Sequence, residues 1–152
     1  MQGLPLELLL SVPVLALLGL AIGSFLNVVV YRTPLMLERQ WWSDVAHHLG
    51  DAESHQRIFG SPQAAPMREA STLLAKALDA LSPLGLARPA SRCPSCGHRI
   101  RWFENLPVVS WLWLRGRCSA CNAPIGLRYP LVEVMCAVLF GATAWRFGAQ
   151  PV

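Results

Sequence analysis

The stretch that decides the fold is residues 8–31, LLLSVPVLALLGLAIGSFLNVVVY, which contains no charged side chain. As an α-helix it would rise about 36 Å, more than the thickness of the hydrocarbon layer of a bilayer. A cleaved signal peptide is the alternative, but no Lys or Arg precedes the run, which is too long for a signal peptide's apolar core. Pro13 is expected to kink the helix or to mark its first turn. The sequence therefore predicts a first transmembrane helix within residues 1–31.

The composition of the whole chain agrees with a membrane protein. Of the 152 residues, 53% are hydrophobic and 14% are charged. An average soluble domain has about 25% charged residues. The length allows at most one ordinary domain, and two spanning helices would leave too few residues for a large independent core. A purely soluble protein is therefore disfavoured.

A second membrane helix is expected in residues 129–148. Between Glu133 and Arg146 the sequence has only 12 uncharged residues, which is short for a free-standing span. The segment can still cross if these two charges lie near the membrane surfaces and Trp145 anchors one end. The predicted fold class is a mainly α membrane protein whose two transmembrane helices flank a long loop.

The positive charges predict the orientation of that loop. Twelve of the 13 Lys and Arg side chains lie in residues 32–130, and no basic side chain precedes the first helix. By the positive-inside rule the loop is cytoplasmic and the N-terminus is on the outer side.

The first part of the loop, residues 32–91, is expected to contain amphipathic helices. One is indicated by apolar side chains that recur every four residues on one side of a helix that could lie on the membrane surface, namely Leu37, Trp41, Val45 and Leu49. A second helical stretch runs from about residue 67 to residue 81 and ends at Ser82-Pro83. Gly and Pro in residues 60–66 predict a hinge between the two.

Two Cys-x-x-Cys knuckles carry the sharpest chemical signal. They are CPSCG, residues 93–97, and CSACN, residues 118–122. Two intervening residues let both thiolates of a knuckle reach one ion, and Gly97 or Asn122 can adopt the left-handed turn that aims backbone amides at sulfur. Four thiolates suit Zn²⁺, although the separation slightly exceeds the usual spacing of about 15–20 residues. We expect a structural zinc site in a ribbon-like module, residues 92–128, with four ligands: Cys93, Cys96, Cys118 and Cys121.

Other interpretations of the segment that contains the two knuckles remain open. Two disulfides are the alternative to a metal, but a cytoplasmic loop disfavours them because thiols there stay reduced. His98 can replace a cysteine as ligand, although with four cysteines present it is expected to be a surface side chain. Nucleic-acid binding is not expected, since basic loops of membrane proteins carry the same residues. The negative charge of a four-thiolate zinc site can be offset by nearby arginines, namely Arg92, Arg99, Arg101, Arg115 and Arg117.

Small and polar residues on both predicted membrane helices indicate packed neighbours. Polar groups are expensive in lipid, so they are expected to face the inside of a helix bundle. The two helices can pair with each other or with helices that this chain does not contain. Cys136 is expected to be a small packing residue. The expected bundle-facing residues are Gly19, Gly23, Ser24 and Asn27 on the first helix, and Glu133, Ala137 and Gly141 on the second.

Three groups of motifs resemble one bacterial family, the type IV prepilin peptidases, which are bifunctional leader peptidases and N-methyltransferases. The first group is GSFLNVVVYRTP, residues 23–34, which is similar to the N-terminal signature of the family and includes Arg32. The second is the knuckle segment with WFENLPVVSW, residues 102–111, which includes Glu104 and Asn105. The third is RYPLVE, residues 128–133. The resemblance covers about residues 19–49 and 92–148, whereas residues 54–90 look like a variable insertion.

The resemblance implies a multi-pass enzyme of the bacterial inner membrane. Such an enzyme cuts the leader from type IV prepilins or type II secretion pseudopilins on the cytoplasmic side, and then methylates the new N-terminus with S-adenosylmethionine. Its peptidase chemistry uses two aspartates, one in a Gly-x-Gly-Asp motif, which share the acid and base roles. No Asp of this chain matches either, so we expect the pair to lie beyond Val152, with no catalytic residue in this chain and no leader cleavage by the chain alone.

Two explanations could account for the lack of both aspartates, and they can be distinguished. The chain is either the N-terminal domain of such an enzyme, from a truncated gene, a split enzyme or a partial gene model, or a non-catalytic membrane protein whose zinc module acts as a scaffold for a partner. In the first case, missing C-terminal helices or a companion subunit would complete the bundle. An open reading frame with Gly-x-Gly-Asp downstream would favour the enzyme.

Overall fold

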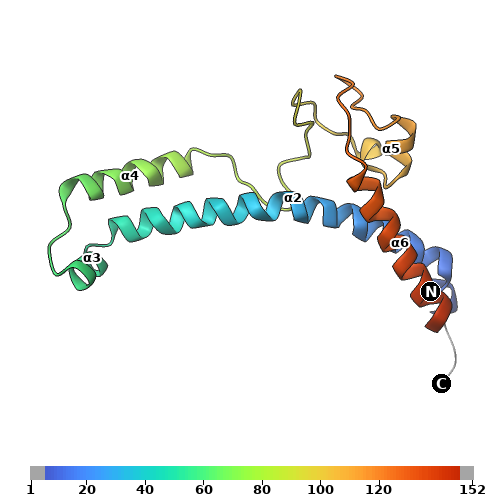
Figure 1. Cartoon of the computed structure of the whole chain (residues 1–152), viewed down its shortest axis with the longest axis horizontal. Coiled ribbons are helices and arrows are strands. Elements are labelled where there is room, and N and C mark those ends of the chain that lie inside the picture. The colour runs from blue at the N-terminus through green and yellow to red at the C-terminus, as the bar shows by residue number, and fades with distance from the viewer. Residues whose placement is uncertain (1–5, 148–152) are drawn as a thin grey trace, which may run out of the picture. The chain divides into compact units, whose positions relative to one another are not determined.

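The computed structural model describes residues 6–147 of the chain (Figure 1). Residues 1–5 of the first predicted segment, and Gly148 at the predicted end of the second membrane helix, lie outside the described residues. Between residues 6 and 147 every regular element is helical, so the predicted mainly α architecture is confirmed. The elements are α1 (Leu6–Leu9), α2 (Val12–Gly50), α3 (Ala52–Phe59), α4 (Ala65–Asp79), the 3₁₀ turn η1 (Trp102–Asn105), α5 (Val109–Trp113) and α6 (Arg128–Phe147).

The chain divides into two compact units. The first unit combines Met1–Val30 with Ala90–Val152, and the second unit is Tyr31–Pro89, so the boundary falls inside α2. Helices α2 and α6 are both long and apolar enough to cross a membrane. Helix α2 begins at Val12, which puts Pro13 in the first turn, where its missing N–H group would have had no partner within the helix.

In the first unit, α2 and α6 pack closely through small residues. A Cβ atom on Gly23 would lie 2.6 Å from the Cα atom of Glu133, and one on Gly19 would lie 2.6 Å from the carbonyl oxygen of Cys136. Such distances exclude any side chain, so only glycine allows the two backbones to approach this closely. Gly141 is buried farther along α6, where a Cβ atom would contact Ala16. The two helices therefore pair with each other.

The second unit begins with the continuation of α2. The residues expected to form a separate amphipathic helix are helical, but they belong to α2, which runs without interruption to Gly50. Pro34 lies inside this helix instead of ending it. Helix α4 agrees with the predicted stretch, and its Ser71 donates a hydrogen bond of 2.8 Å to the carbonyl oxygen of Ala46 on α2.

Helix α3 was not predicted. Its N-cap is Asp51, whose carboxylate accepts hydrogen bonds from the N–H groups of Glu53 and Ser54 and from the Ser54 hydroxyl. These bonds, the Ser54 hydroxyl first, lower the pKa of Asp51 below its ordinary value. Asp51 before a short helical run was the sequence signal that could have revealed α3.

Candidate metal centre

The two knuckles have the same backbone construction. In the first, the N–H group of Gly97 donates to the carbonyl of Cys93 (2.9 Å), and in the second the N–H group of Asn122 donates to the carbonyl of Cys118 (3.0 Å). Gly97 and Asn122 both have positive φ values, of 71° and 57°. Each knuckle is closed by one isolated β-bridge, Arg92 with Arg99 and Arg117 with Pro124. The left-handed turns expected from the sequence are therefore present.

This construction brings all four knuckle sulfurs together. The Sγ atoms of Cys93, Cys96, Cys118 and Cys121 lie within 4.8 Å of one another. The shortest separations join the two knuckles: 3.8 Å from Cys93 to Cys121 and 4.0 Å from Cys96 to Cys118. Sulfurs at the corners of a tetrahedron, each about 2.3 Å from a zinc ion, lie about 3.8 Å apart. The cluster therefore fits a zinc-sized ion that prefers sulfur ligands.

The same distances do not fit disulfides. All five cysteines are free, and the shortest sulfur separation of 3.8 Å is almost twice the length of a disulfide bond, which is about 2.04 Å. Cys136, the fifth cysteine, lies on α6 against Gly23 of α2, where it is a packing residue.

The surroundings of the first knuckle shift the pKa values of its two cysteine thiols in opposite directions. The backbone N–H groups of Cys96 and Ser95 lower the pKa of the Cys93 thiol to about 6. At Cys96, the N–H group of His98 acts in the lowering direction, but the adjacent sulfur of Cys121, burial and the other cysteines together raise the pKa to about 12. A metal ion removes this conflict, because its positive charge stabilises every thiolate at once.

Glu104 ties the two knuckles to each other. Its Oε2 atom accepts a hydrogen bond from the N–H group of Arg101 (2.8 Å) and lies 3.4 Å from Nε2 of His98. Its Oε1 atom accepts one from the hydroxyl of Ser119 (2.6 Å). These donors, the Arg101 N–H group first, lower the pKa of Glu104. Because His98 directly follows the first knuckle and Ser119 lies in the second, one carboxylate holds both knuckles together.

His98 is a partly exposed side chain, and it is engaged by neighbouring polar groups. Its side chain is 25% exposed, it contacts Glu104 and Ser119, and it is not one of the four clustered ligands. Sequence reasoning singled out Glu104 only by resemblance and missed Ser119, for which the only signal was its place inside a Cys-x-x-Cys knuckle. Asn105 ends η1 as an exposed residue.

One polar side chain joins the module to the helix pair, and another joins the two helices of the pair. Glu133 is 7% exposed, and its Oε2 atom accepts a 2.7 Å hydrogen bond from the N–H group of Val108. Val108 has φ of 58°, which is unusual for a β-branched residue, so this bond helps to hold an otherwise unfavourable backbone. Asn27 on α2 donates to the carbonyl oxygen of Tyr129 on α6 (3.0 Å). Ser24 lies half-buried on α2, one residue after Gly23.

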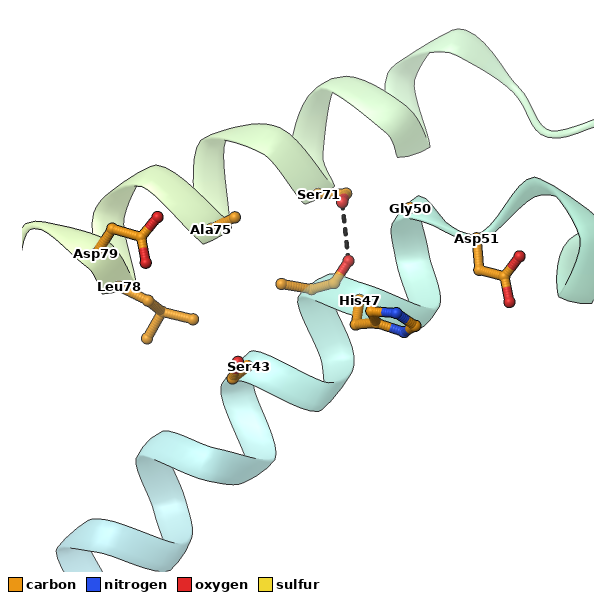
Figure 2. A pocket seen from close by; sticks show the side chains of 9 residues that line it. Ser43, His47, Gly50, Asp51, Ser71, Ala75, Leu78 and Asp79 are labelled. Atoms are coloured by element: carbon orange, nitrogen blue, oxygen red, sulfur yellow. Dashed lines mark hydrogen bonds between the residues drawn. The ribbon is translucent and has the colours of Figure 1, made fainter.

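Arg32 does not belong to this site. It is buried in the second unit, where its guanidinium donates hydrogen bonds to the carbonyl oxygens of Gly85 (2.7 Å), Leu86 (3.3 Å) and Pro89 (2.6 Å). Arg32 therefore fixes residues 85–89 against α2. The second unit also has a pocket between α2 and α4, in which Figure 2 labels His47, Asp51, Ser71 and Asp79. None of the residues that line it belongs to a metal-ligand cluster found among the described residues.

The fold and the site together define a class of protein: a mainly helical protein with two candidate membrane helices that pack closely, and with an attached four-cysteine module that could hold a metal ion. The model of one family, the bacterial peptidase A24 N-terminal domain, matches residues 17–147. The chain belongs to this family. The match includes α2 from residue 17 onward, all of α6 and all four clustered cysteines.

Several curated relatives share one name. The chain is 49% identical over 134 residues to the prepilin leader peptidase/N-methyltransferase of Pseudomonas putida, a match that covers 88% of this chain and 38% of the relative. Identity is 43% over 149 residues with the protein of that name from Stutzerimonas stutzeri, covering 95% of this chain and 43% of the relative. The chain is 40% identical over 138 residues to the protein of the same name from Neisseria gonorrhoeae, a match that covers 91% of this chain and 40% of the relative. The chain thus spans about two fifths of these relatives. No solved structure matches it.

Proposed function

We propose that this chain forms the membrane-anchored, zinc-binding N-terminal part of an enzyme that removes leader peptides from prepilins and methylates the new N-terminus. The observation that carries the proposal is the four-sulfur cluster attached to a close-packed helix pair, both inside the family match. The names of the relatives support the two reactions.

Zinc is the ion we propose for the cluster. The sulfur separations support an ion of its size and coordination, and four thiolates would leave no open position for a water molecule or a substrate. The bound ion would therefore supply folding energy to the module. The protein's own side chains support it, because Glu104 holds the knuckles together and Glu133 attaches the module to α6.

The peptidase aspartates are proposed to come from outside these 152 residues. The chain has three aspartates, all in the second unit and none in a Gly-x-Gly-Asp motif: Asp44, Asp51 and Asp79. Asp51 is engaged as the cap of α3, and the other two are exposed. Further helices or a companion subunit would supply the pair, and the chain alone would not cleave a leader.

The remaining assignments rest on family resemblance and on charge. We propose that type IV prepilins or type II secretion pseudopilins are the substrates and that S-adenosylmethionine is the methyl donor, and we assign no residue among 6–147 to binding either. The proposed location is the bacterial inner membrane with the metal module in the cytoplasm and the N-terminus in the periplasm, because the arginines of the module favour the cytoplasmic side.

A chimera tests the proposal. This chain would replace the matching N-terminal part of the Pseudomonas putida relative, in a strain without its own prepilin peptidase. Leader cleavage and N-methylation of a prepilin would be read by mass spectrometry. We expect the chimera to cleave the leader, and the same chimera with Cys93→Ser and Cys118→Ser to lose most of its activity.

Two outcomes would contradict the proposal in different ways. A correctly inserted, zinc-loaded chimera without activity would favour the alternative, a non-catalytic scaffold. Cleavage by this chain alone, in the same strain, would show that the peptidase aspartates are not supplied from elsewhere.

A further inference from the structure

We propose that the segment between the knuckles docks an apolar face into the headgroup region of an anionic lipid bilayer, beside the start of α6. The face consists of four side chains and is called the α5 face: Leu106, Val109, Leu112 and Trp113. The inference goes beyond the proposed function, because it gives the metal module a membrane contact of its own.

The four side chains of the α5 face are unusually exposed for large apolar residues. The exposed fractions are 42% for Leu106, 55% for Val109, 62% for Leu112 and 83% for Trp113. Val109, Leu112 and Trp113 are three and four residues apart, so they lie on one side of the short helix. Adjacent large apolar side chains in water are costly, and a face of this kind marks a surface that is normally covered.

A partly buried hydrogen bond sets the level of the start of α5 along α6. The N–H group of Val108, directly before α5, donates to the carboxylate of Glu133 at 2.7 Å. Glu133 is five residues after the first residue of α6, about 7 Å along the helix axis. The start of α5 therefore lies beside the second turn of a candidate membrane helix, as Figure 1 shows.

The charges around the face complement anionic lipid. Arg101, Arg115 and Arg117 flank the segment, and Arg128 begins α6. The only acidic residue between the knuckles is Glu104, whose carboxylate is already bonded to Ser119. Apolar and Trp side chains bordered by arginines are the composition of a membrane-interface segment, in which the guanidinium groups reach the lipid phosphates.

Lipid is favoured over a protein partner because Glu133 holds the start of α5 at the level of α6, a helix that exposes apolar side chains which lipid would cover. On α6 the side chains of Leu131, Val138 and Leu139 are about 60% exposed. A membrane that solvates these side chains would meet the α5 face at the level of Glu133. No separate binding partner is needed to bury it.

The test is fluorine NMR on the full zinc-loaded chain, labelled with fluorotryptophan, in nanodiscs of phosphatidylcholine and phosphatidylglycerol. The Trp113 resonance is assigned by its loss in Trp113→Phe. A lipid spin-labelled near its headgroup and a soluble gadolinium chelate are then added separately. We expect the lipid label to broaden the Trp113 resonance several-fold more than the chelate does.

Glu133 supplies the variant that tests the anchoring. In Glu133→Ala we expect broadening of Trp113 by the lipid label to fall several-fold, while Glu133→Gln, which keeps a carbonyl oxygen as acceptor, retains most of it. Zinc content, and the resonance of Trp111 inside the module, would show that the module stays folded.

Two results would overturn the inference. Stronger broadening of Trp113 by the chelate would place the α5 face in water. Protection from both reagents would show that protein covers the face, either a second copy of the chain or another partner.

Discussion

The metal module, residues 90–127, and the second unit, Tyr31–Pro89, are both nearly without an apolar core, yet different groups fill their interiors. In the module the buried residues are Cys93, Cys118 and Gly116. In the second unit they are Arg32, Ala46 and Ser71, and the two polar ones bond main-chain carbonyls. The interior of the module is therefore built from potential ligands of the proposed ion, whereas that of the second unit is built from hydrogen bonds between side chains and the main chain.

Removing the metal should have the largest effect. Structural zinc contributes about 10–16 kcal/mol of apparent binding free energy in small modules, and that energy is folding energy. A strong chelator should therefore unfold residues 90–127, with loss of amide protection in hydrogen exchange. Cys93→Ser or Cys118→Ser should lose most of the bound metal.

The second unit provides the internal control for that experiment. Its amides, including those of α4, should keep their protection after chelation, because no ligand of the ion lies in Tyr31–Pro89. Equal loss of protection in both units would mean that the ion stabilises the whole chain. The proposed difference between the metal module and the second unit would then be wrong.

Arg32→Ala should have the next largest effect, confined to the second unit. It removes a buried guanidinium that holds three carbonyl oxygens in residues 85–89. Since hydrogen bonds of charged donors contribute about 1.5–3 kcal/mol, we expect a destabilisation of about 3 kcal/mol and increased exchange at Gly85 and Leu86. Zinc content should not change. Arg39→Ala, which removes an exposed bond to Ser82, is the matched control and should have a smaller effect.

Glu104→Gln should weaken the metal site without abolishing it. The amide keeps the shape of the carboxylate but loses the charge that attracts the donors on both knuckles. Groups that orient metal sites in this way change metal affinity by about 10-fold or more, so we expect a loss of about 10-fold in competition with a chromophoric chelator. If the variant bound the metal with wild-type affinity, Glu104 would have no role in supporting the metal site.

The difference in stability between the wild-type protein and the Glu104→Gln variant should disappear in acid. The folded-state pKa of Glu104 is lowered from 4.5, so its contribution to stability is present above that pH and is lost as the pH falls through the folded value. Thermal unfolding of the two proteins should therefore differ at neutral pH and converge once the pH has fallen below the folded-state pKa of Glu104. A difference that persists in stronger acid would show that the charge is not responsible.

Ser71→Ala should have the smallest effect. It removes one buried hydrogen bond, from the Ser71 hydroxyl to the carbonyl oxygen of Ala46, worth about 1 kcal/mol. We expect a modest decrease in the urea concentration at which the amides of α4 lose half of their protection from hydrogen exchange. Thr72→Ala, whose exposed hydroxyl bonds only its own helix, should be near neutral.

The features that the sequence predicted are those with local causes. The apolar run before Arg32 was enough to predict a membrane helix, and two intervening residues in each knuckle were enough to predict the sulfur cluster. A closely packed neighbour for the first helix was expected from Gly19 and Gly23, because small residues at four-residue spacing form one face of a helix, but the sequence left open whether that neighbour was the second helix or one outside the chain.

The features that the sequence did not predict depend on distant partners. The first helix was expected to end at Tyr31, but Arg32 bonds residues more than fifty positions away and α2 continues to Gly50. The link from Glu104 to Ser119 and the link from Glu133 to Val108 join segments 15 and 25 residues apart. No periodicity encodes such contacts, so only the folded chain reveals them.

The most direct test of the central claim is zinc-edge X-ray absorption on freshly isolated protein, with metal and protein measured on the same sample. A four-thiolate site predicts about one zinc per chain and a single shell of four sulfurs at about 2.3 Å. Metal-free protein with oxidised sulfurs, or a shell of nitrogen and oxygen ligands, would contradict the account.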